Sequence, residues 1–238
     1  MILGGRCSRR CGFCAIETGR PDSVEEDEPE RVAEAAEALG LQYVVITSVA
    51  RDDLGDEGAG HFARCIRAVK ERIEEVRVEV LTPDFHGRRE LIEEVCGAGP
   101  AVYNHNLETV ARLQKKVRPQ ASYECSLKVI REVKENFPET RTKSGLMLGL
   151  GEREEEVLEA ASDLRGAGCE ILTLGQYLPP SRKHLPVVEY VPPEVFHRLA
   201  DTIRQLGYHE VYAGPYVRSS YHAEETFDMA ERSGERKG

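Results

Sequence analysis

Hydrophobic and polar positions alternate along the chain in blocks that recur about every thirty residues. Each block joins a short apolar run to a longer amphipathic one. The run Tyr43–Thr47 is rich in β-branched residues and predicts a strand that is buried on both faces. Between residues 28 and 39 apolar side chains recur at helical spacing, and Gly40 follows as the expected end of that helix. The alternation is typical of βα units.

The same pattern places the other elements. Strands are expected at 43–47, 76–81, 101–104, 145–150, 170–176 and 211–213, and helices at 28–39, 61–73, 88–96, 123–136, 154–165 and 193–205. Polar residues such as Thr47, Ser48, Asn104 and Asn106 stand at the carboxyl ends of these strands. Parallel strands that alternate with helices form either a barrel or an open doubly wound sheet. Polar strand ends favour a barrel mouth with one shared site.

Composition narrows the class of protein. The chain has 238 residues, of which 40% are hydrophobic, and this is enough for one large domain with a sizeable core. Its 32 basic and 42 acidic residues give a net charge of −10, which disfavours nucleic acid or an anionic membrane as a partner. No apolar run approaches the roughly 18 residues of a membrane span, and the first residues do not resemble a signal peptide. We therefore expect a cytoplasmic protein.

Three of the seven cysteines, Cys7, Cys11 and Cys14, form a C-x3-C-x2-C motif. Thiolates bind soft metals, and three on one loop can hold three irons of a cubane cluster. No fourth cysteine follows at ferredoxin spacing, so one iron would keep an open position for a ligand. Arg9 and Arg10 would offset the charge of such a cluster. Structural zinc with a histidine as the fourth ligand is the alternative, although zinc sites usually contain paired cysteine motifs.

The cysteine motif and the βα pattern after it resemble the radical S-adenosylmethionine (SAM) superfamily. Several segments are similar to the lipoyl synthase family within it: VVITSVARDDL (44–54), VEVLTPDF (78–85), YNHNLETV (103–110), TKSGLMLGLGE (142–152), ILTLGQYLPPSRKHLPV (171–187) and GPYVRSSYHAE (214–224). They occur in the order found in that family and cover residues 1 to about 224.

The resemblance implies a fold and a chemistry. The fold is a partial parallel (β/α)6 TIM-like barrel over residues 1–215, with its first strand cut to residues 2–4, followed by the RSSYHA segment and a frayed tail over 216–238. A reduced 4Fe-4S cluster cleaves SAM, and the 5′-deoxyadenosyl radical removes hydrogen from C6 and C8 of an octanoyl chain bound to a lysine. Sulfur comes from a second, auxiliary 4Fe-4S cluster. The implied partners are an octanoylated lipoyl-carrier domain or H-protein and an electron donor such as ferredoxin or flavodoxin.

The resemblance also implies site residues. Cys7, Cys11 and Cys14 would ligate the SAM cluster, and Ser220 would ligate the auxiliary cluster. The predicted cofactor-binding residues are Phe13 near the adenine, Thr47 and Ser48 near the methionyl group, Asn104 and Asn106 on one strand, Lys143 facing a carboxylate, and Arg218 beside the serine ligand. Ordinary packing of Phe13, turn formation by the asparagines and solvation of Lys143 are the alternatives. Arg182 and Lys183 would either meet an acidic carrier domain or form an ordinary exposed pair.

One departure concerns the second cluster. The family carries a C-x4-C-x5-C motif upstream of the segment that begins here at Met1, and this sequence has none. The other four cysteines, at 65, 96, 125 and 169, are expected to be small core residues. A start assigned too late, a fragment, and a one-cluster variant that cleaves SAM without inserting sulfur all fit this departure. A zinc-binding βα protein without catalytic activity is the remaining alternative.

Overall fold

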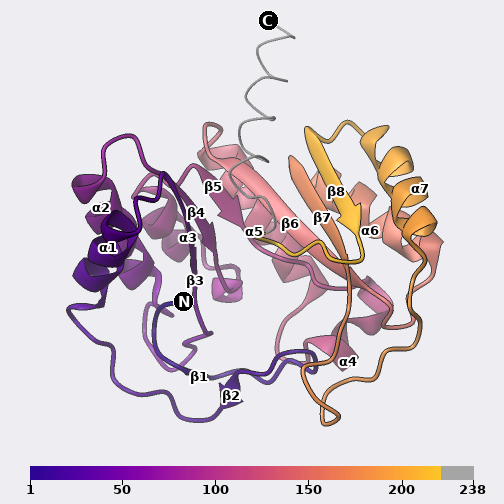
Figure 1. Ribbon diagram of the computed structural model, residues 1–238, viewed down its shortest axis with the longest axis horizontal. Helices are drawn as coiled ribbons and strands as arrows, with labels where there is room; N and C mark the ends of the chain where they lie inside the picture. The colour runs from indigo at the N-terminus through magenta and orange to yellow at the C-terminus, as the bar shows by residue number, and fades with distance from the viewer. Residues whose placement is uncertain (221–238) are drawn as a thin grey trace, which may run out of the picture.

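The computed structural model describes residues 1–220; residues 221–238, which include the end of the RSSYHA segment and the expected frayed tail, lie outside the described residues. Six parallel strands pair in the order in which they occur along the chain. They are β3 (Tyr43–Thr47), β4 (Arg77–Leu81), β5 (Val102–Asn104), β6 (Arg141–Leu148), β7 (Ile171–Gln176) and β8 (Glu210–Gly214). The sheet curves around a central space and is left open between β3 and β8 (Figure 1). This confirms the expected partial parallel barrel.

Helices cover the outer side of the curved sheet (Figure 1). They are α1 (Glu28–Ala38), α2 (Ala59–Arg72), α3 (Arg89–Cys96), α5 (Tyr123–Asn136), α6 (Glu154–Gly166) and α7 (Pro193–Arg204), with the short α4 (Gln114–Val117) and the 3-10 turns η1 (Phe85–Gly87) and η2 (Ala111–Leu113) between them. Their buried side chains form two hydrophobic clusters, one around α1 to α3 and one around α6 and α7. Each half of the open barrel therefore has its own core.

Local sequence explains where the helices begin and which face they bury. Helix α5 begins after Ser122, whose hydroxyl accepts a hydrogen bond of 3.0 Å from the Cys125 backbone N–H. Helix α7 begins at Pro193, whose fixed φ suits the first helical turn. Phe196 and Ile203 on its inner face are fully buried. None of the helices within residues 1–220 is long and apolar enough to cross a membrane.

The sequence prediction was wrong at β6. The expected strand at 145–150 lies at Arg141–Leu148, because Thr142 and Lys143 are buried between neighbouring strands in spite of their polarity. The strand ends before Gly149, whose φ of +100° turns the chain. Glu152 accepts hydrogen bonds from the backbone N–H groups of Gly149 and Leu150, so residues 149–152 form a turn.

The N-terminal segment crosses the carboxyl-end side of the sheet. Ile2 forms an isolated parallel bridge to Ser48, so the first barrel strand is reduced to a single bridged residue. The chain then forms two short paired strands that the sequence did not predict, β1 (Arg6–Cys7) and β2 (Glu17–Thr18). Between them, the Gly12 N–H donates to the Val117 carbonyl at 2.8 Å and the Leu185 N–H donates to the Gly12 carbonyl at 3.0 Å. The cysteine loop thus spans the barrel mouth from one end of the open sheet toward the other (Figure 1).

Candidate functional site

The three cysteines of the motif face one cavity of about 320 Å³ at the barrel mouth. Cys7, Cys11 and Cys14 are half-buried free thiols. The Cys7 sulfur accepts hydrogen bonds from the backbone N–H groups of Arg9 at 3.4 Å and Ala50 at 3.3 Å. The Cys14 N–H donates to the Cys11 carbonyl at 3.3 Å, which closes a turn between these two ligands. The structure thus brings together the three thiols that the sequence singles out.

A buried arginine holds the cysteine loop in place. The Arg9 guanidinium lies 2.8 Å from Asp52 and 2.7 Å from Asp84. Burial alone would raise the pKa of Asp84, but the hydrogen bond and charge of Arg9 prevail and lower it to about 2. Because two carboxylates neutralise Arg9, it does not supply the free positive charge that the sequence indicated. Arg9 positions the loop instead.

The surroundings of Cys11 and Cys14 favour the protonated thiol over the thiolate. Burial raises the pKa of Cys11 to about 11, although the nearby charge of Arg118 acts against this shift. Burial also raises the pKa of Cys14. Iron binds thiolates, so metal binding must release these protons. The site is therefore built to be completed by a metal, which supplies the positive charge that stabilises the thiolates.

Polar groups from two strand ends line the same cavity. Thr47 is the last residue of β3, Ser48 follows it, and Asn106 lies just beyond β5. Ser48 Oγ and Asn106 Oδ1 are buried and have no hydrogen-bond partner within residues 1–220. Buried oxygens of this kind usually have a partner in the functional protein. Three thiols beside two such oxygens therefore fit a 4Fe-4S cluster with an open iron and a polar ligand such as SAM next to it.

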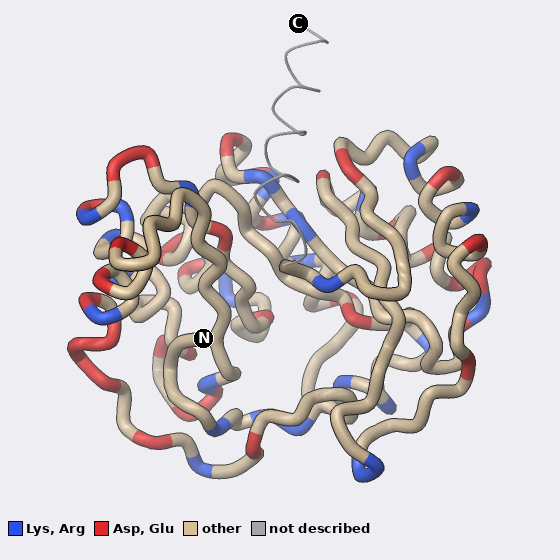
Figure 2. The backbone as a smooth tube through the Cα atoms, in the orientation of Figure 1, with Lys and Arg blue, Asp and Glu red and all other residues tan. Residues whose placement is uncertain are grey.

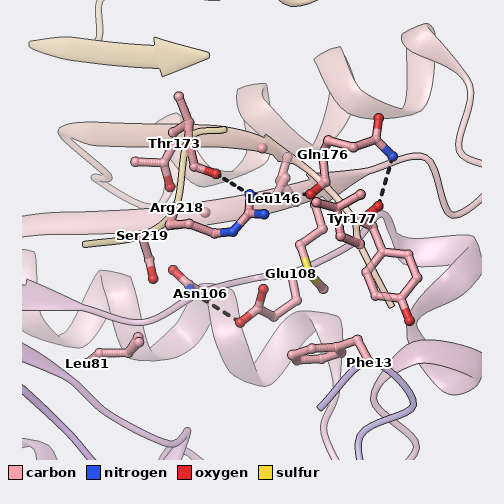
Figure 3. Close-up of a pocket in the computed structure, with 15 residues that line it drawn as sticks. Phe13, Leu81, Asn106, Glu108, Leu146, Thr173, Gln176, Tyr177, Arg218 and Ser219 are labelled. Carbon is pink, nitrogen blue, oxygen red and sulfur yellow. Dashed lines mark hydrogen bonds between the residues drawn. The ribbon is translucent and has the colours of Figure 1, made fainter. Parts of the chain in front are cut away.

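A second cavity, of about 250 Å³ (Figure 3), adjoins the first. The two cavities share Phe13, Leu81, Asn106 and Glu108. Beyond these residues the wall is largely apolar, with Leu146, Met147, Tyr177, Leu178 and Val217, and it reaches Arg218 and Ser219 near the end of the described chain. One continuous hollow therefore leads from the cysteines into a largely apolar space lined by β6, β7 and the chain after β8.

Glu108 stands at the junction of the two cavities and was not predicted from the sequence. Its carboxylate accepts a 3.1 Å hydrogen bond from Asn106 Nδ2, and burial raises its pKa (Figure 3). Its φ of +68° is unusual for a residue other than glycine and is fixed by a backbone bridge to Leu146. The sequence feature that could have indicated Glu108 is its position two residues after Asn106 in the segment YNHNLETV.

Two of the predicted binding residues, Lys143 and Asn104, line neither cavity. The Lys143 ammonium pairs with Glu79 at 2.9 Å, and both side chains are only 1% exposed. Asn104 donates to the same carboxylate at 3.1 Å. The alternative of a solvated Lys143 is therefore wrong. Strand β5 ends at Asn104, so the two asparagines do not alternate along one strand, and only Asn106 lines a cavity. Cofactor binding by Lys143 and Asn104 stays a prediction.

The described residues do not form a ligand set for a second cluster. Ser220 is exposed and lines neither cavity, and no cysteine within residues 1–220 lines the cavity that contains Arg218. Cys65, Cys96 and Cys169 are buried in the core, as expected, whereas Cys125 is half-buried on α5. The role of Ser220 as a ligand to a second cluster therefore stays a prediction.

Comparison with known proteins places these features in a family. The model of the Radical SAM superfamily matches residues 1–164. Lipoyl synthase of Thermus thermophilus is 58% identical over 229 residues, which cover 95% of this chain and 71% of that protein. Lipoyl synthase of Methylococcus capsulatus is 56% identical over 226 residues, covering 94% and 70%. Lipoyl synthase 2 of Thermosynechococcus vestitus is 53% identical over 232 residues, covering 94% and 80%.

Solved structures agree with the fold. The crystal structure of Streptococcus suis SuiB bound to S-adenosylmethionine matches with a TM-score of 0.71 at 12% identity, over 94% of this chain and 51% of that chain. Methylornithine synthase matches with a TM-score of 0.66 at 14% identity, over 98% and 80%. At these identities the likeness shows the fold alone.

Proposed function

Because the chain belongs to the radical SAM superfamily and, within it, to the lipoyl synthase family, we propose that its hollow holds the cluster, SAM and the octanoyl chain in that order. The family reaction inserts sulfur at C6 and C8 of a protein-bound octanoyl-lysine, with a 4Fe-4S cluster and SAM as cofactors. The observation that carries the proposed arrangement is the continuity of the two cavities from the cysteines to an apolar wall.

The cysteine end of the hollow holds the cofactors. Cys7, Cys11 and Cys14 would hold the cluster, which would supply the electron that the cleavage of SAM requires. Ser48 and Asn106 offer buried acceptors to the amino and hydroxyl groups of SAM. Glu108 adds a carboxylate acceptor at the junction with the second cavity.

The apolar end of the hollow orients the acyl chain. Leu146, Met147 and Val217 line it with groups that exclude water and offer no charge to a hydrocarbon. A dry wall keeps the reactive carbon close to the cofactors and limits side reactions. Exposed Leu178 and Arg218 lie at the rim of this cavity, where an acyl-lysine would enter.

The partners follow from this chemistry. The acyl group requires an octanoylated carrier, for which a lipoyl-carrier domain or an H-protein is proposed, and the cluster requires a one-electron donor such as ferredoxin or flavodoxin. A cytoplasmic setting is proposed because the cysteines of this chain are all free, as is usual in a reducing compartment.

Deuterium transfer tests the arrangement. The reconstituted protein is incubated without oxygen with SAM and an octanoyl-lysine peptide deuterated at C6 and C8, and 5′-deoxyadenosine is analysed by mass spectrometry. We expect deuterium in the 5′-deoxyadenosine. The variant Met147→Lys places a charge in the apolar wall and should lower deuterium transfer at least about tenfold, while unlabelled cleavage of SAM persists. Met147→Leu is the matched control and should retain transfer. Unlabelled 5′-deoxyadenosine from the unmodified protein would contradict the proposal.

A further inference from the structure

Exposed cations gather on the outer side of the cysteine loop. The segments 8–16, 114–121 and 179–188 contain no Asp or Glu, although the whole chain has a net charge of −10. Their basic residues are Arg9, Arg10, Lys115, Lys116, Arg118, Arg182 and Lys183. Arg9 and Arg118 are buried. The other five are exposed, and we call them the basic face. The segments that contain them run through the lower part of the view in Figure 2.

The three segments are joined at the cysteine loop itself. Gly12 is hydrogen-bonded to Val117 on one side and to Leu185 on the other, at 2.8 and 3.0 Å. The Arg10 N–H donates to Gln120 Oε1 at 2.6 Å, and His184 Nε2 lies 3.0 Å from the Cys14 carbonyl oxygen. The basic face therefore surrounds the loop that carries the three thiols.

The thiols are also reached from this outer side. A separate hollow of about 360 Å³ is lined by Cys7, Cys11 and Cys14 together with Arg10 and Lys183. This hollow shares no lining residue with the second cavity, which is proposed to hold the acyl chain. A protein seated on the basic face would thus lie against the metal centre rather than against the substrate cavity.

The cations of the basic face lack the ion pairs found elsewhere on the surface. Arg72 pairs with Glu37 at 2.7 Å, Arg112 pairs with Glu156 at 2.7 Å, and most of the other exposed arginines in the described chain are paired likewise. Within the described chain no ion pair involves any member of the basic face. Unpaired cations of one sign attract a partner of the opposite sign and speed its encounter. The complementary partner is therefore acidic.

We infer that the basic face is the docking surface for an acidic one-electron donor protein. The inference rests on the proposed function, because a cluster at the three cysteines is what requires an electron. In each productive encounter the donor loses one electron and the metal centre gains one, and no atom is transferred. The octanoylated carrier fits this face less well, because its acyl group must enter the other cavity, whose rim contains Leu178 and Arg218.

Direct binding tests the inference with flavodoxin as the acidic probe. The variant Lys115→Glu/Lys116→Glu reverses two charges of the basic face, and Lys128→Glu/Arg131→Glu reverses two exposed charges on α5 as the matched control. We expect the affinity of the reconstituted protein for oxidised flavodoxin at low salt to fall at least about tenfold in the first variant and little in the control. Carbodiimide cross-links should join flavodoxin carboxylates to Lys115, Lys116 or Lys183. Equal affinity in both variants would overturn the inference.

A second measurement separates this inference from the proposed function. With reduced methyl viologen, a small cation that needs no docking surface, both variants should cleave SAM at the rate of the unmodified protein. With flavodoxin as the donor, only the Lys115→Glu/Lys116→Glu variant should be slow. Loss of affinity for the octanoylated carrier domain instead of flavodoxin would assign the face to the carrier and overturn the inference. Absence of SAM cleavage with methyl viologen in every protein would contradict the proposed function, while the binding result would still decide the docking surface.

Discussion

At the barrel mouth, the site is marked by individual polar groups that lack a partner within the described chain and by half-buried thiols. Ser48 Oγ and Asn106 Oδ1 are buried without partners in the described chain, and burial raises the pKa of the half-buried Cys11 thiol. Each group gains a partner only when the metal and its ligand are present. The cysteine spacing alone predicted the thiols. Lys143 was expected to face a carboxylate, but its partner Glu79 was not predicted, and neither was Glu108, because these contacts depend on the register of neighbouring strands.

Asn106 provides a direct test of ligand binding at this scale. The variant Asn106→Ala removes the unpartnered amide oxygen without altering the cysteine loop. We expect the dissociation constant for SAM to rise about 3- to 10-fold, as for the loss of one hydrogen bond, with iron content unchanged. Equilibrium binding of SAM to the reconstituted protein measures this. Asn136→Ala, at the end of α5, is the control and should leave the affinity unaltered. Unchanged affinity in Asn106→Ala would argue against its role.

His105 gives the protein a defined response to acid. Its Nδ1 lies 2.9 Å from the Thr82 carbonyl, which can only accept, so Nδ1 carries the proton and Nε2 accepts from the Ser126 hydroxyl. Burial, with help from the charge of Arg118, lowers the pKa of His105 to about 4. The unfolded chain therefore binds a proton at this residue below its ordinary pKa of 6.5, while the folded chain does not.

The free energy of unfolding should consequently fall as pH drops from 6.5 through about 4, by up to about 3 kcal/mol from His105. Urea unfolding of the metal-free protein at several pH values measures this slope. His105→Gln should flatten it, because the variant has no group to protonate there. His197→Gln, which removes an exposed histidine on α7, is the control and should keep the slope of the unmodified protein. An identical slope in His105→Gln would contradict this explanation.

Secondary-structure elements were predictable where side-chain periodicity alone decides them. Helix α5 and strand β3 begin and end where the pattern indicated, because their buried faces are mostly apolar. Strand β6 was misplaced, because polar residues at its start are buried in pairs with other strands. The short strands β1 and β2 have no periodicity to detect, and they form because the cysteine loop is held at both ends.

Close packing between β7 and the chain after β8 offers a test at the element scale. A Cβ atom on Gly175 would clash with the Val217 carbonyl oxygen, so the segment that carries Arg218 would have to move. Gly175→Ala should cost about 1–3 kcal/mol and lower the melting temperature by about 3–10 °C. Gly166→Ala at the end of α6 meets no atom within 4 Å and should leave the melting temperature unchanged or slightly raised. Equal melting temperatures for the two variants would refute this packing argument.

At the scale of the whole molecule, the sequence left a barrel and a doubly wound sheet open, and strand order decides between them. A doubly wound sheet reverses direction within its strand order, whereas here β3 to β8 pair in sequence. The sheet stays open, and the cysteine loop crosses its mouth. The three thiols therefore face a cavity on one side and the hollow beside the basic face on the other. Under the proposed function, the substrate and the electron would approach the metal centre by separate routes.

The measurement that tests this account most directly is the iron and acid-labile sulfide content after anaerobic reconstitution. We expect about four irons and four sulfides per chain, with a change in the electron paramagnetic resonance spectrum of the reduced cluster when SAM is added. Cys11→Ala should lose the cluster, and Cys125→Ala, which removes a half-buried thiol on α5, should keep it. Zinc without sulfide, or equal loss of iron in both variants, would contradict the account.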